Sequence, residues 1–197
     1  MANTNPKTRS ARNLALGGML AALSAILMFF SFNVPFVPSF LKIDFSELPA
    51  LIGAYALGPV VGGAICLVKN LINVLFTTTG GVGELSNFIL GVCLVVPAGV
   101  AYRRMPNRKG ALIGGIIGAV IMAGLSLVTN YFIVYPVYAK IMPIEVILDM
   151  YKAINPSVDS LWDALVVFNL PFTFIKGMIS VLMCSIVYKS LVKVING

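Results

Sequence analysis

Six long stretches of apolar residues, separated by short polar or proline-containing breaks, constrain this chain more than any other feature. They cover about residues 14–31, 47–57, 60–76, 83–102, 111–137 and 161–194. Of the 197 residues, 59% are hydrophobic and only 11% are charged, whereas a soluble domain carries about 25% charged residues. Too few polar side chains remain to cover a surface that faces water. We therefore predict an all-α membrane protein with six transmembrane helices in a single domain over residues 1–197.

Charged residues are distributed unevenly between the two sides of this predicted bundle. The N-terminal tail (1–12), the loop after the fourth stretch and the C-terminal end carry most of the 14 Lys and Arg residues and no acid, so the seven acids all fall on the opposite side. Cytoplasmic loops are enriched in Lys and Arg, so we expect both termini in the cytoplasm. Residues 32–46 and 138–160 are then an outer loop and an outer connector.

Residue types that the chain lacks exclude several classes of function. It contains no histidine and no Gly-Lys-Ser or Gly-Lys-Thr sequence, which argues against histidine-dependent catalysis, a histidine metal site and a P-loop. The three cysteines lie in apolar stretches and are expected as reduced thiols. The net charge of +7 indicates topology rather than nucleic-acid binding. We therefore expect no enzyme, no catalytic residue, no metal and no cofactor.

Polar side chains inside the apolar stretches gather toward the outer half of the bundle. Lys69 and Lys176 remain once the loop cations are assigned, and a charge within the bilayer costs at least ~2.5–3.5 kcal/mol. A Lys69–Glu84 pair would satisfy the first lysine, whereas Lys176 has no obvious acid. Several amides lie at the same depth, which favours a polar-lined ligand cavity over simple inter-helical hydrogen bonds.

Aromatic residues populate the same layer, and the sequence leaves open whether they form an interfacial belt or stack on a flat ligand. The candidate ligand-binding residues are Phe40, Glu84, Asn87, Asn130, Tyr131, Asn169 and Lys176.

Residues 33–42 form an apolar loop that Pro35 and Pro38 keep from becoming helical. Because a loop in water should be polar, we predict that it is a lid, with Phe36 and Phe40 over the pocket. Ser46, before an apolar run, indicates the start of a helix.

Small residues form two stripes on the first predicted helix, where they would let another helix approach closely. An external membrane partner and packing inside the bundle are both open explanations. The candidate docking residues are Gly17, Gly18, Ala21, Ala22 and Ala25. A similar stripe of glycines at 110, 114 and 118 is interpreted as internal packing.

Short motifs along about residues 10–195 are shared with a known family. They are the sequence Leu-Lys-Ile-Asp-Phe-Ser-Glu-Leu-Pro at 41–49, Gly58-Pro59, Lys69-Asn70, Gly83-Glu84, Asn87-Phe88, Asn130-Tyr131, Phe168-Asn169 and Lys176-Gly177. By these motifs the chain resembles the substrate-binding S components of energy-coupling factor (ECF) vitamin transporters, and most closely the riboflavin-specific type.

The resemblance implies a subunit of a prokaryotic cell membrane that captures riboflavin, or its phosphate, outside the cell. It also implies three partners: a second membrane subunit and two ATPases that supply the energy. In this family the first loop covers the ligand, and small residues of the first helix contact the membrane partner.

Three other readings stay open at this point. An S component for thiamine, folate or pantothenate would need a more charged pocket than two lysines and Glu84 provide. A self-contained carrier or channel would need a coupling-ion or gating pathway, for which the sequence offers no repeat or chain of acids. A membrane enzyme fits least well, because histidine and paired intramembrane acids are absent.

Overall fold

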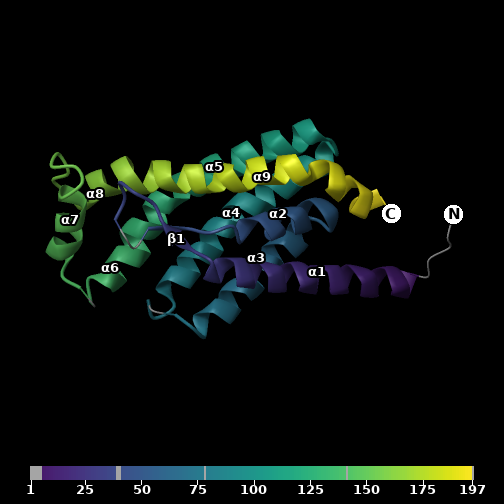
Figure 1. The fold of residues 1–197 in the computed structure, drawn as a ribbon, viewed down its shortest axis with the longest axis horizontal. Helices are drawn as coiled ribbons and strands as arrows, with labels where there is room; N and C mark the ends of the chain where they lie inside the picture. Colours follow the sequence, from purple (N-terminus) through teal and green to yellow (C-terminus); the bar gives the residue numbers. More distant parts are fainter. Residues whose placement is uncertain (1–5, 39–40, 78, 141, 197) are drawn as a thin grey trace.

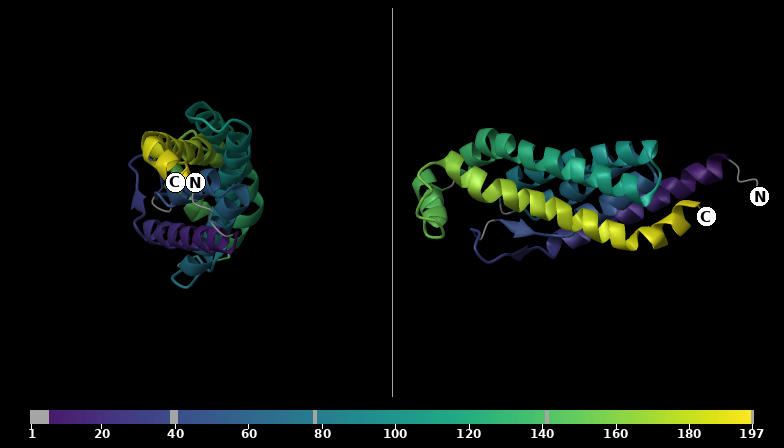
Figure 2. Two further views of the ribbon diagram at one scale, coloured as in Figure 1. Left: turned by 90° about the vertical axis from the view of Figure 1, so that its right-hand side faces the viewer. Right: turned by 90° about the horizontal axis from the view of Figure 1, so that it is seen from above.

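The computed structural model describes residues 6–38, 41–77, 79–140 and 142–196 of the chain, which form an elongated bundle of helices (Figure 1). The long axes of most helices follow the long axis of the molecule, as the two views of Figure 2 show. The elements in chain order are α1 (Pro6–Phe29), β1 (Phe32–Asn33), β2 (Lys42–Ile43), α2 (Glu47–Ala56), α3 (Pro59–Val74), α4 (Val82–Arg104), α5 (Arg108–Thr129), η1 (Asn130–Val134), α6 (Tyr135–Tyr138), α7 (Ile144–Lys152), α8 (Leu161–Ala164), η2 (Leu165–Asn169) and α9 (Leu170–Asn196).

Four helical segments in the described part of the chain are long and apolar enough to cross a membrane. They are Ser10–Phe29, Val82–Arg104, Arg108–Tyr138 and Leu161–Val187. A fifth apolar helix, α3, has 16 residues, and α2 has only 10. At a rise of about 1.5 Å per residue, α2 is half the length of a full span. The helices follow the predicted apolar stretches closely, but not every one of them is long enough to span the bilayer by itself.

The short helix α2 lies in the middle of the bundle and is covered by α1, α3, α4 and α9. Most of its residues are buried, and Leu51 and Ala54 belong to the main apolar core. The predicted break after α2 is present. Gly58 adopts a positive φ of 111° there, and Pro59 occupies the first turn of α3, where its missing N–H costs nothing.

The glycine stripe of α5 packs against α4, as the sequence predicted. A Cβ atom at Gly118 would lie 2.2 Å from the backbone oxygen of Leu94, and one at Gly114 would lie 2.9 Å from that of Ala98. These two glycines therefore let the backbones of α4 and α5 lie in contact. The two helices together form one wall of the bundle.

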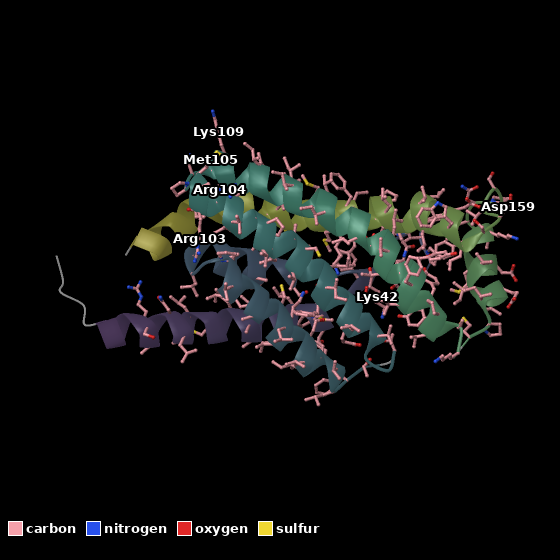
Figure 3. The ribbon with its side chains drawn as sticks, turned by 180° about the vertical axis from the view of Figure 1, so that it is seen from behind. Lys42, Arg103, Arg104, Met105, Lys109 and Asp159 are labelled. Atoms are coloured by element: carbon pink, nitrogen blue, oxygen red, sulfur yellow. The ribbon has the colours of Figure 1, made fainter. Side chains whose placement is uncertain are left out.

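The two ends of the bundle differ in charge. The start of α1 and the end of α9 lie at one end, together with the α4–α5 turn. That turn carries Arg103, Arg104 and Lys109, whereas Asp159 lies at the opposite end (Figure 3). This separation agrees with the charge pattern of the sequence.

At the acidic end, the helices α6, α7 and α8 close the bundle (Figure 1). The sequence suggested only a polar connector over residues 138–160, and α7 was not predicted. Ile147 and Tyr151 of α7 are buried in a second apolar cluster with Val134, Val158 and Leu165. The connector is therefore a packed cap that sits on the ends of the long helices.

Candidate functional site

A cavity of about 140 Å³ lies between the main core and this cap. Its walls come from α4, α5, η1, α6, η2 and α9, and Leu41 of the loop after β1 closes one side. The lining residues are Leu41, Gly83, Ser86, Asn87, Leu90, Met122, Asn130, Val134, Tyr135, Tyr138, Asn169, Thr173 and Lys176.

Three asparagines supply much of the polar surface of this cavity, and two of them lie in π-helical segments. Asn130 begins η1 and Asn169 ends η2. Isolated π-helical turns inside α-helices occur frequently at functional sites, because the extra residue changes where the next side chains point. The third asparagine is Asn87 on α4, whose buried Oδ1 has no hydrogen-bond partner among the described residues. A buried acceptor without a partner is costly, so a ligand that donates a hydrogen bond there would remove the cost.

Of the predicted ligand-binding residues, Asn87, Asn130, Asn169 and Lys176 line this cavity together. Glu84 lies in a separate groove between α3 and α4, where its carboxylate accepts hydrogen bonds from Thr77 and Thr79 at 2.8 and 3.2 Å. Tyr131 is 40% exposed, and its ring lies 5.8 Å from that of the exposed Trp162. Neither Glu84 nor Tyr131 lines the cavity.

The predicted lid contains a short antiparallel hairpin, in which Phe32 pairs with Ile43 and Asn33 with Lys42. Phe36 is 86% exposed, so the prediction that it covers the pocket is wrong in this structure. Phe40 lies outside the described residues. Among the described residues of this loop, Leu41 is the one that lines the cavity.

Three tyrosines near the cavity were not among the predicted ligand-binding residues. Tyr135 and Tyr138 line it, and Tyr151 lies behind it, with its hydroxyl 2.7 Å from Asn169 Oδ1. Thr173 was also missed, although it is four residues after Asn169 and three before Lys176, and so shares their helix face. That spacing was a usable signal for Thr173. No local pattern identified Tyr151, which lies in a segment interpreted as a polar connector.

Lys176 is paired with an acid, contrary to the sequence analysis. Its Nζ lies 2.8 Å from Asp44 Oδ2 and 3.9 Å from Glu47 Oε1. Asp44 immediately follows β2, so this ion pair joins the end of the lid segment to α9. The partner was missed because the two residues are 132 positions apart.

Lys69 is paired with Glu47 and not with Glu84. Its Nζ lies 3.0 Å from Glu47 Oε1 and 2.5 Å from Ser46 Oγ. Ser46 is the residue before α2, as predicted, but its side chain does not cap the helix. Instead, its hydroxyl and backbone N–H both donate to Asp44 Oδ1. Two acids and two lysines thus form one buried network with no net charge.

Both carboxylate oxygens of Asp44 have hydrogen-bond partners. Its Oδ1 accepts from Ser46 and its Oδ2 accepts from Lys176, which compensates for the burial of this charge.

The small residues of α1 divide between two faces. Ala21 and Ala25 are only 5% and 3% exposed, and Gly17 packs near Val61 of α3. Gly18 and Ala22 are exposed, and a Cβ atom at Gly18 would contact nothing within 4 Å. The prediction of an external docking face is therefore wrong for Ala21 and Ala25, which pack inside the bundle.

Comparison with known proteins places this geometry in a family. The family model described as ECF transporter, substrate-specific component, matches residues 12–188. The chain belongs to this family. A solved structure of the S component of a bacterial ECF transporter matches it with a TM-score of 0.75 and 29% identity, covering 95% of this chain and 99% of that chain.

The curated relatives that match this chain are named as riboflavin transporters. The riboflavin transporter RibU of Staphylococcus aureus (strain TCH60) is 32% identical over 88% of this chain and 86% of its own length. The riboflavin transporter FmnP of Bacillus subtilis (strain 168) is 28% identical over 90% of each chain. The resemblance inferred from the short motifs is thereby confirmed at the level of the family, which is one of bacterial membrane transport proteins.

We predict that Lys176→Met destabilises this S component strongly, because it leaves Asp44 buried without its ion-pair partner, a loss on the order of 3–5 kcal/mol. Adding Asp44→Asn should recover much of the loss, since the amide oxygen can still accept from Ser46. The measurement is the unfolding temperature in detergent, with the exposed Lys109→Met as the matched control. A double variant no more stable than Lys176→Met would contradict the assigned pairing.

Proposed function

We propose that this S component binds riboflavin at the asparagine-lined cavity and delivers it across the membrane. The observation that carries the proposal is the set of three asparagines around one cavity. Riboflavin has a ring edge with two carbonyl groups and an N–H, and amide side chains can both donate and accept hydrogen bonds. The names of the relatives support the same ligand.

The charge of the cavity also favours a neutral ligand. Lys176 is the one charged residue among those lining the cavity, and its charge is balanced by Asp44 at 2.8 Å. An anionic vitamin such as folate or pantothenate would find no free cation there, and cationic thiamine would find no free acid. Riboflavin is neutral near pH 7 and requires neither.

We further propose that residues 32–46 act as a lid that moves when the ligand enters. Sites for ligands of this size have volumes of about 300–1,000 Å³, and the cavity has about 140 Å³. Leu41 lines one side of it, and Pro35 and Phe36 of the same loop are exposed. Displacing this loop enlarges the cavity without separating the long helices.

The transport cycle that we propose needs partners. The chain has no P-loop sequence, so the energy for uptake comes from a membrane coupling subunit and two ATPases, as the family implies. We place both termini in the cytoplasm and count six crossings in the bacterial cell membrane, α2 together with the extended residues before it making one of them. The basic α4–α5 turn at the end where the chain begins and finishes supports this orientation.

We expect the purified S component to bind one riboflavin per chain without ATP, because the cavity lies within this chain. Titration calorimetry with riboflavin, thiamine, folate and pantothenate measures this directly. Asn87→Leu should weaken riboflavin binding at least tenfold, since it removes a buried acceptor from the cavity wall. Its matched control is Asn13→Leu, the same change at an exposed asparagine of α1, because the side chain of Asn107 in the α4–α5 turn caps α5. Heat with another vitamin and none with riboflavin would refute the proposed ligand.

Ligand binding should slow backbone hydrogen exchange in residues 32–46, because a closed lid has fewer opening motions. Exchange measured by mass spectrometry, with and without saturating riboflavin, provides the comparison. Exchange in the Asn107 turn, at the far end of the bundle, serves as the internal control and should stay constant. Equal exchange of the 32–46 segment in both states would indicate a static loop.

Docking to the coupling subunit is expected on the exposed stripe of α1. Ala22→Trp should abolish riboflavin uptake by cells that also make the coupling module, while binding by the purified chain is preserved, because the side chain projects outward. Ala21→Trp, one residue away, should lose both binding and folding, because Ala21 is buried. Uptake that survives Ala22→Trp would place the docking surface elsewhere.

A further inference from the structure

Tyr151 lies in α7, outside the cavity, and is fully buried. Its hydroxyl donates a hydrogen bond to Asn169 Oδ1 at 2.7 Å. The hydroxyl oxygens of Tyr135 and Tyr151 are 2.5 Å apart. Because the single hydroxyl proton of Tyr151 goes to Asn169, the Tyr135 hydroxyl donates to Tyr151. These two hydrogen bonds run in one direction, from Tyr135 through Tyr151 to Asn169 Oδ1, and Tyr135 also has Asn169 itself as a side-chain neighbour.

This direction determines what Asn169 can offer a ligand. An asparagine side chain has one acceptor oxygen and one NH₂ donor, and here the oxygen is engaged by Tyr151. The NH₂ group is then the polar group that Asn169 presents to the cavity that it lines. Asn87 supplies the opposite polarity, since its buried Oδ1 has no partner among the described residues. The two asparagines thus offer one donor and one acceptor.

The aromatic ring of Tyr151 is held by contacts that do not involve its hydroxyl. Its centroid lies 5.2 Å from that of Phe168, and the ring belongs to the apolar cluster of the cap with Ile147 and Val158. Packing therefore fixes the ring, and the hydroxyl is the part of the side chain that orients Asn169. Without it, the amide could turn and offer either end to the cavity.

We propose that Tyr151 is a positioning residue that holds Asn169 as a hydrogen-bond donor, so that the site selects a ligand with a carbonyl oxygen facing Asn169. This inference rests on the proposed function, because riboflavin supplies such carbonyl oxygens at its ring edge. On this proposal the connector over residues 138–160 contributes to ligand selection, because its residue Tyr151 orients Asn169 without lining the cavity itself.

The test compares Tyr151→Phe with Tyr55→Phe in the intact chain. Both variants remove one buried phenolic oxygen, but the Tyr55 hydroxyl donates to the backbone oxygen of Ala111 at 3.0 Å, and Tyr55 does not line the cavity. Each protein is titrated with riboflavin, 2-thioriboflavin and 4-thioriboflavin. Sulfur is a weaker hydrogen-bond acceptor than oxygen, so replacing the carbonyl that faces Asn169 should weaken binding to the wild-type chain.

We expect Tyr151→Phe to weaken riboflavin binding on the order of tenfold, and Tyr55→Phe to leave it unchanged. The decisive readout is the thio penalty. We define it as the factor by which binding weakens when the carbonyl oxygen that faces Asn169 is replaced by sulfur, in whichever of the two thio analogues carries that change. It should be at least threefold smaller in Tyr151→Phe than in the wild type. A purely structural role would weaken all three ligands by the same factor and leave the thio penalty constant.

A second variant keeps the test decisive if Tyr151→Phe does not fold. Asn169→Asp has nearly the same shape and can still accept from Tyr151, but it replaces the NH₂ donor with an oxygen. It should lose riboflavin affinity by on the order of 100-fold. Unchanged affinity in Asn169→Asp, or an unchanged thio penalty in Tyr151→Phe, overturns the positioning role. A wild-type chain that binds no riboflavin overturns the proposed function, and this inference with it.

Discussion

The buried network of two acids and two lysines is the constraint on which the rest of this structure depends. An unpaired charge inside a bilayer is expensive, and Asp44, Glu47, Lys69 and Lys176 are all buried. Their charges cancel, and Ser46 links the two ion pairs through its hydroxyl. The network joins the segment before α2 to α3 and α9. A helix of only 10 residues can begin in the middle of the bundle because its first residue finds an ionic partner there.

The same network sets the chemistry of the ligand cavity. Lys176 lies on the cavity wall, but its ammonium group is committed to Asp44. The polar groups left for a ligand are then mainly amides and hydroxyls, which recognise neutral hydrogen-bonding groups and not a net charge. The proposed preference for a neutral vitamin therefore rests on ion pairing in the bundle, because Lys176 belongs both to the cavity wall and to the buried ionic network.

The sequence was sufficient for the long helices and for part of the site, but not for α7, and the reasons for this success are local. Apolar stretches and the Gly58-Pro59 break determine where helices begin and end, and spacing places Asn169, Thr173 and Lys176 on one face. The ion-pair partners and the π-helical segments depend on contacts between distant parts of the chain. Glu84 was assigned to Lys69 because it follows closely in sequence, whereas Glu47 is the closer acid in space. Tyr151 was missed because its neighbours in the sequence are polar, and such a pattern does not indicate a buried side chain.

The cavity is bounded by two apolar clusters that lie in different parts of the fold. The main core joins α2, α4, α5 and α9 through the long helices, and the cap cluster joins α7 and α8 to their outer ends. Opening the site through the long helices would disturb the ion network and the close α4–α5 contact. Opening it through the loop that carries Leu41 would disturb neither, provided that Asp44 stays paired with Lys176. In the lid that we propose, the ion pair marks the limit of movement: a ligand displaces the part of residues 32–46 that precedes Asp44, whereas Asp44 and Ser46 stay with the fixed bundle.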